Sequence, residues 1–99
     1  MKLNDLLLNT GIKCPDSWGK IDITGISYDS RKIQKGNLFV CLSGRNTDGH
    51  IFAGDAAFRG AAVVISEREL PLPGTPLLLV EDTRKALAEI AANYYGHPN

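Results

Sequence analysis

The sequence has few cysteines and no long apolar run, and each shortage removes a class of protein. Its two cysteines, Cys14 and Cys41, form no Cys-x-x-Cys pair, so neither a zinc site nor a disulfide framework is expected. No apolar segment approaches the roughly 20 residues that cross a bilayer, and Asn4 and Asp5 interrupt the leucines where a signal peptide would have its apolar core. We therefore expect a cytoplasmic protein with no membrane partner.

The sequence also lacks an excess of either charge. It contains 11 Lys and Arg residues and 11 Asp and Glu residues. Because nonspecific nucleic-acid binding needs a broad positive field, no nucleic-acid partner is expected, and an anionic ligand must be held by local donors. The 43% hydrophobic and 22% charged content is that of a globular chain, and 99 residues are enough for one core. Residues 1–99 are thus expected to form a single domain.

The hydrophobic pattern predicts buried strands that alternate with helices. Continuous apolar runs predict strands at residues 38–42, 61–65 and 77–80, and a β-type stretch over 21–26 would be interrupted by Gly25. A short helix is expected where leucines recur near the start, at residues 3–7. The fold class is therefore α/β, with a small mixed or parallel sheet of about four to five strands and flanking helices.

Two further helices are predicted by helical spacing, at residues 50–59 and 83–95. Asp48 is expected to cap the first, and Asp82 or Thr83 the second. The apolar residues expected to face the core are, in the first helix, Ile51, Phe52, Ala56 and Phe58 and, in the second, Leu87, Ile90, Ala91 and Tyr94.

A polar loop, residues 43–49, follows the predicted strand at 38–42, and open α/β sheets bind ligands beyond the carboxyl ends of their strands. Its segment "GRNTDG" has the glycine spacing that opens a nucleoside-triphosphate loop. The lysine and hydroxyl that complete such a loop are missing, since His50 and Ile51 follow. This loop is therefore expected to bind a ligand without transferring a phosphoryl group. Two other interpretations stay open: a solvated loop without a ligand, and a β-hairpin turning at Asp48-Gly49.

Several motifs occur in a fixed order within "DSRKIQKGNLFVCLSGRNTDGHIFAGDAAFRGAAVVISE": Asp-Ser-Arg, a Gly-x-Leu-Phe-Val strand, Gly-x-x-x-Asp-Gly-His, an alanine-rich helix, and Gly-Ala before a strand. From Ile23 onward the chain closely resembles the N-terminal domain of the Mur ligases of peptidoglycan synthesis. The ending "VEDTRKALAEIAANYYGHP" is similar to the family member that adds the third residue of the stem peptide. The member that adds D-alanyl-D-alanine is the alternative within the family.

The resemblance implies that this domain binds the UDP part of UDP-N-acetylmuramoyl-L-alanyl-D-glutamate. It implies that central and C-terminal domains, absent from these 99 residues, bind ATP, Mg2+ and the incoming diamino acid, meso-diaminopimelate or L-lysine. The chain then looks like part of a larger ligase, with no cofactor and no activity of its own. A non-catalytic interaction module is the alternative outside the family.

The resemblance also implies which residues meet the nucleotide. The expected UDP-sugar site comprises eight residues of two polar turns: Tyr28, Ser30, Arg45, Asn46, Thr47, Asp48, Gly49 and His50. Ser30 is placed near the diphosphate and Tyr28 beside the nucleotide, while residues 45–47 fall on the variable part of the loop around uracil. Residues 48–50 serve equally to turn the chain and start the helix. No catalytic or metal-binding residue is expected.

Asp29 and Arg31 leave two alternatives open, since they either pair with each other or contact the ligand. The whole site depends on one expectation. The turns at residues 28–31 and 43–50 must converge in space into one cradle for a uridine diphosphate group.

Overall fold

A parallel four-stranded sheet forms the centre of the computed structural model, which describes residues 1–43 and 48–96. The strands lie in the order β1 (Gly25–Ser27), β2 (Asn37–Val40), β3 (Val63–Ser66) and β4 (Leu77–Leu79). Each strand pairs in parallel with the next. The carboxyl ends of all four strands therefore lie along one edge, and the predicted α/β class is confirmed.

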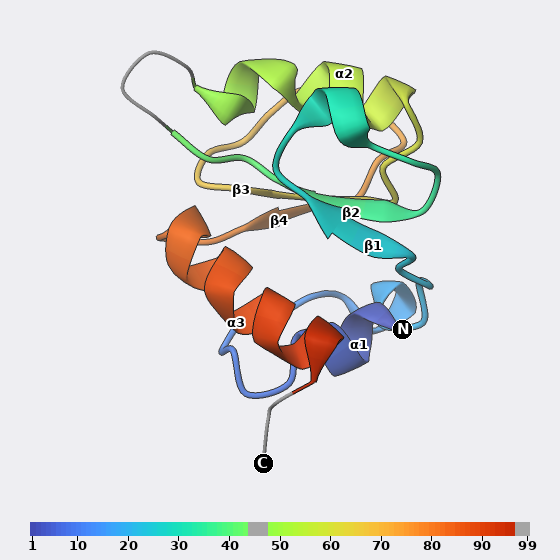
Figure 1. The fold of residues 1–99 in the computed structure, drawn as a ribbon, viewed down its shortest axis with the longest axis vertical. Coiled ribbons are helices and arrows are strands. Elements are labelled where there is room, and N and C mark those ends of the chain that lie inside the picture. The colour runs from blue at the N-terminus through green and yellow to red at the C-terminus, as the bar shows by residue number, and fades with distance from the viewer. Residues whose placement is uncertain (44–47, 97–99) are drawn as a thin grey trace.

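Helices cover both faces of this sheet (Figure 1). One face carries α2 (Ala53–Phe58) with the 3-10 helices η2 (Ser30–Lys32) and η3 (Gly49–Phe52). The opposite face carries α1 (Leu3–Leu6) and α3 (Thr83–Tyr95), and η1 (Asp16–Trp18) lies between α1 and β1 in the chain. In the described part of the chain, no helix combines the length and the apolarity that crossing a bilayer requires.

Two hydrophobic clusters, one on each face of the sheet, explain the continuous apolar runs of the central strands. Alternate side chains of a strand point to opposite faces. Leu38 and Val40 accordingly pack into the cluster with α1 and α3, whereas Phe39 and Cys41 pack into the cluster with α2. Every residue of β2 and β3 is buried. Burial on both faces excludes the alternation of polar and apolar residues that a half-exposed strand would show.

The first strand is shorter than the predicted β-type stretch at residues 21–26. Only Gly25–Ser27 pairs with β2. The residues before it bond to the start of the chain instead, since the Leu3 N–H donates to Ile21 O at 2.8 Å and the Ile23 N–H donates to Met1 O at 2.7 Å. Their backbone groups are thus satisfied outside the sheet.

The helix predicted at residues 50–59 is present, but most of its predicted core face was wrong. Ile51 and Phe58 are 69% and 84% exposed, and Phe52 is 39% exposed. Ala56 is buried as predicted, and Ala53 is buried beside it against the sheet. The chain enters α2 through a 3-10 helix with three residues per turn, which shifts the register of the apolar side chains. The hairpin interpretation is also wrong, because β2 and β3 are parallel.

The last helix, α3, agrees with its prediction. Asp82 is its N-cap, and the Asp82 carboxylate accepts the N–H groups of Arg84 and Lys85 at 3.0 and 3.1 Å. Ile90 is fully buried, while Leu87 and Tyr94 pack against the same cluster.

Candidate functional site

The turn after β1 is held by its own polar side chains. The Ser27 hydroxyl donates to the Asp29 carbonyl at 3.0 Å and accepts the Asp29 N–H at 3.1 Å. Asp29 caps η2 by accepting the Arg31 N–H at 3.0 Å, and the Arg31 guanidinium donates twice to the same carboxylate, at 3.1 and 2.9 Å. These bonds lower the pKa of Asp29 to about 2. Asp29 and Arg31 therefore pair with each other, the first of the two alternatives.

The loop after β2 returns to the sheet edge at Gly49. The Gly49 N–H donates to Leu42 O at 2.7 Å, and Ser43 and Asp48 form an antiparallel bridge. A Cβ on Gly49 would lie 2.7 Å from both the backbone N and the backbone O of Leu42. Glycine is thus required here for a close approach of two backbone segments.

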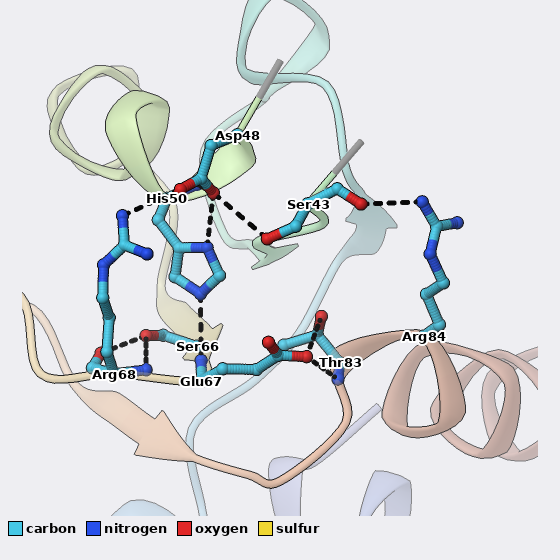
Figure 2. A network of polar contacts seen from close by, with 8 residues as sticks. All are labelled: Ser43, Asp48, His50, Ser66, Glu67, Arg68, Thr83 and Arg84. Carbon is cyan, nitrogen blue, oxygen red and sulfur yellow. Dashed lines mark hydrogen bonds and ion pairs between the residues drawn. The ribbon is translucent and has the colours of Figure 1, made fainter. Parts of the chain in front are cut away.

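His50 is buried beside this loop, with 3% of its surface exposed. Its Nδ1 lies 2.7 Å from Asp48 Oδ1, and its Nε2 accepts the Glu67 N–H at 3.0 Å. Since Nε2 accepts a bond, the proton of the neutral ring is on Nδ1 and is donated to Asp48. Figure 2 shows the ring between these two partners.

Asp48 receives donors from two further groups. Its Oδ1 accepts the His50 N–H at 2.9 Å, and its Oδ2 accepts the Arg68 guanidinium at 2.9 Å. The backbone and ring bonds from His50, followed by the bond from Arg68, hold the pKa of the Asp48 carboxyl well below its usual range. A carboxylate with this many donors stays ionised at any physiological pH.

The same set of contacts extends to α3, the helix that follows β4 (Figure 2). Glu67 Oε2 accepts the Thr83 N–H at 2.9 Å and the Thr83 hydroxyl at 3.1 Å. The Arg84 guanidinium donates to Ser43 O at 2.9 Å. Side chains therefore link the segments that follow β2, β3 and β4 along one edge of the sheet.

A cleft of about 510 Å³ lies at this edge. It is lined by Tyr28, Asp29, Ser30 and Arg31 from the first turn and by Phe52 from the end of η3. Tyr28 is 63% exposed, and Ser30 is buried. Within residues 1–43 and 48–96 the Ser30 hydroxyl has no hydrogen-bond partner. The segments that follow β1 and β2 thus meet at one cleft.

The structure divides the eight expected site residues into three groups. Tyr28 and Ser30 line the cleft. Asp48, Gly49 and His50 lie at the same sheet edge but are engaged in contacts within the protein. The three remaining expected residues, Arg45, Asn46 and Thr47, lie outside the described residues.

Sequence reasoning missed Phe52 and the partners of the second turn. Helical spacing assigns Phe52 to the core, and no motif points to Glu67 or Arg68. The sequence could have pointed to Glu67 and Arg68, because polar residues that directly follow a buried parallel strand lie at the same sheet edge as the ends of the other strands.

The described residues include groups that can contact a ligand at the cleft. Among them, no group of three or more His, Cys, Asp and Glu side chains could hold a metal ion. Cys41 is fully buried, and burial raises the pKa of its thiol to about 12, so it is no nucleophile. Tyr28 and Phe52 bring aromatic rings to the lining of the cleft, and Ser30 brings a hydroxyl.

Sequence comparison identifies relatives of one kind. Residues 22–95 match the family described as Mur ligase family, catalytic domain. Over 100% of its length the chain is 49% identical to the UDP-N-acetylmuramoyl-L-alanyl-D-glutamate--2,6-diaminopimelate ligase of Syntrophomonas wolfei, of which it covers 20%. The chain spans about a fifth of the length of the curated relatives it matches.

Solved structures of similar fold carry related names. A UDP-N-acetylmuramoylalanyl-D-glutamyl-2,6-diaminopimelate--D-alanyl-D-alanyl ligase from Acinetobacter baumannii superposes with a TM-score of 0.74 at 29% identity, over 93% of this chain and 21% of that one. The MurF ligase from Thermotoga maritima in complex with ADP gives a TM-score of 0.62 at 30% identity, over 72% of this chain and 16% of that one.

Proposed function

This chain belongs to the Mur ligase family, and from that premise we propose that it is the UDP-recognition domain of a ligase that acts on UDP-N-acetylmuramoyl-L-alanyl-D-glutamate. The family resemblance predicted from the motifs is confirmed. The parent ligase adds a diamino acid, meso-diaminopimelate or L-lysine, in the cytoplasm. The 49% identity to a 2,6-diaminopimelate ligase supports this member of the family.

The cleft at the carboxyl edge of the sheet is the observation that carries the proposal. Its two aromatic side chains, Tyr28 and Phe52, suit the faces of a uracil ring or a ribose, and stacking of a base on such a ring contributes about 1–3 kcal/mol. The buried Ser30 hydroxyl suits a diphosphate oxygen, since a hydrogen bond to a charged acceptor is about twice as strong as one between neutral groups.

The second turn completes the proposed site. Residues 45–47 surround uracil in this proposal, and Asp48, Gly49 and His50 shape the edge of the sheet next to them. The proposal therefore draws on the segments that follow two adjacent parallel strands.

ATP and Mg2+ are assigned to domains outside this chain. A triphosphate loop needs a lysine and a hydroxyl after its second glycine. His50 and Ile51 stand there, and the ring of His50 is buried with both nitrogens bonded. The residues present therefore do not fit a triphosphate. Alone, the chain is expected to bind weakly and to catalyse nothing, because a ligand that spans domains loses much of its contact area.

An NMR titration of the 99-residue chain with UDP-N-acetylmuramoyl-L-alanyl-D-glutamate tests the proposal. We expect amide shifts at residues 28–31 and 43–52 at near-millimolar ligand. Tyr28→Ala and Ser30→Ala should weaken binding. Tyr95→Ala is the matched control, since Tyr95 is 73% exposed and does not line the cleft. The absence of any shift would favour the interaction module.

A D-alanyl-D-alanine-adding ligase is the second candidate, because the solved structures of similar fold include that enzyme. A ligase assay on a protein containing this chain separates the two candidates. Turnover of the UDP-linked dipeptide with a diamino acid supports the first candidate. Turnover of the UDP-linked tripeptide with D-alanyl-D-alanine supports the second.

A further inference from the structure

The ring of His50 joins two segments of the sheet edge that are far apart in the sequence. Its Nδ1–H donates to Asp48, which ends the loop after β2, and its Nε2 accepts the backbone N–H of Glu67, 17 residues later, just after β3. The His50 side of both bonds is buried, since this residue is 3% exposed. Bonds of this kind hold their groups in place more strongly than exposed ones.

His50 lies inside η3, which begins at Gly49 and ends at Phe52. Phe52 is the residue by which this segment lines the cleft, together with the turn that contains Tyr28 and Ser30. His50 and Phe52 belong to the same short 3-10 helix, so an anchor at His50 limits how far the backbone at Phe52 can shift.

Arg68 anchors the same element from a second direction. Its guanidinium donates to Asp48 Oδ2 at 2.9 Å, while Asp48 Oδ1 caps η3 through the His50 N–H. Asp48 thus receives donors from η3 itself and from the segment after β3. Neither the His50 ring nor the Arg68 guanidinium lines the cleft.

We propose that Asp48, His50 and Arg68 are positioning residues that hold η3, and with it the Phe52 wall of the cleft, in the geometry that binds UDP. The inference rests on the proposed function and extends it to residues that need not touch the ligand. When only a fraction of molecules has the wall in place, the apparent dissociation constant rises by the inverse of that fraction.

Asn37 provides a matched control at the opposite end of β2. It is buried, its Oδ1 accepts the Gln34 N–H at 3.0 Å, and its amide donates to Thr24 Oγ1 at 3.1 Å. Asn37→Ala therefore removes two bonds of a buried polar side chain, as His50→Ala does, but at the amino edge of the sheet. If the role of His50 were only structural, His50→Ala and Asn37→Ala would change UDP affinity to the same extent.

The experiment measures UDP affinity and thermal unfolding of the 99-residue chain. We expect both variants to unfold at a lower temperature, and His50→Ala alone to weaken UDP binding about tenfold. His50→Gln, whose Oε1 replaces Nε2 as acceptor, should recover part of the loss. In the wild type, 15N spectra of the ring should show a protonated Nδ1 and an unprotonated Nε2. Arg68→Met should weaken UDP binding less, because the Arg68 side chain is 54% exposed.

Failure of this inference is distinct from failure of the proposed function. If the wild type binds UDP and His50→Ala binds it equally well, the positioning role is overturned and the proposed function stands. Equal loss of affinity in Asn37→Ala and His50→Ala overturns it too, because general destabilisation then explains both. If the wild type does not bind UDP at near-millimolar concentration, both proposals are overturned.

Discussion

Gly49 offers the sharpest test of how the site is built. It opens η3, and its N–H donates to Leu42 O at 2.7 Å. In Gly49→Ala the new methyl group would lie 2.7 Å from the backbone N and O of Leu42, closer than real Cβ contacts come. Both neighbours are backbone atoms, so neither can turn aside as a flexible side chain would. The loop or η3 must move instead.

Two effects should lower the free energy of unfolding of Gly49→Ala. Overpacking in a well-packed region costs about 1–3 kcal/mol. Separation of the two segments weakens the Gly49 to Leu42 hydrogen bond, which is worth about 1 kcal/mol. The free energy of unfolding should therefore fall by about 2–4 kcal/mol in total. For a domain of this size, the midpoint of thermal unfolding should fall by roughly 10 °C or more.

Thermal unfolding followed by circular dichroism measures this shift, and Gly54→Ala is the control. Gly54 lies in α2, and a Cβ there would meet nothing within 4 Å. Alanine is favoured over glycine inside a helix by about 0.5–1 kcal/mol, so this variant should unfold at a higher temperature. The same substitution five residues apart thus has opposite expected signs. A Gly49→Ala variant as stable as the wild type would refute the close-approach argument.

Three further predictions concern caps, thiols and pH. Asp82→Ala should lower the unfolding free energy by about 1 kcal/mol in urea denaturation, because it removes the cap of α3; an unchanged midpoint would contradict this. A thiol reagent should modify native Cys14 well before Cys41, since Cys41 is fully buried and its pKa is raised to about 12; equal rates would count against that packing. Asp29 has its pKa lowered to about 2, so its stabilisation is present above pH about 4 and is lost as the pH falls toward 2. Asp29→Asn should flatten the acid side of the stability profile, and a profile that matches the wild type would show that the pair with Arg31 contributes nothing.

The sequence predicts an element well when its contacts are close in the sequence or when its surroundings are apolar on every side. Asp82 caps α3 as predicted because a cap bonds only to the next turn. The runs of β2 and β3 predict burial because both faces of those strands are covered. Of the predicted core face of the helix at residues 50–59 only Ala56 is buried, because the 3-10 helix ahead of α2 changes the register.

The candidate site shows the same division. Sequence motifs identify the turn with Tyr28 and Ser30, and the structure places both at the cleft. Phe52, which lines the same cleft, has the sequence signature of a core residue. Its exposure follows from how η3 lies against the sheet edge, which no local pattern encodes.

By itself, the sequence determined the family, the alternation of strands and helices, and which loops follow which strands, because motifs and hydrophobic periods are local properties of the chain. Only the tertiary structure decided that His50 joins Asp48 to Glu67 and that Phe52 and Tyr28 line the same cleft. The physical reason is the parallel sheet, which brings the carboxyl ends of all its strands to one edge and so makes neighbours of residues that the sequence separates.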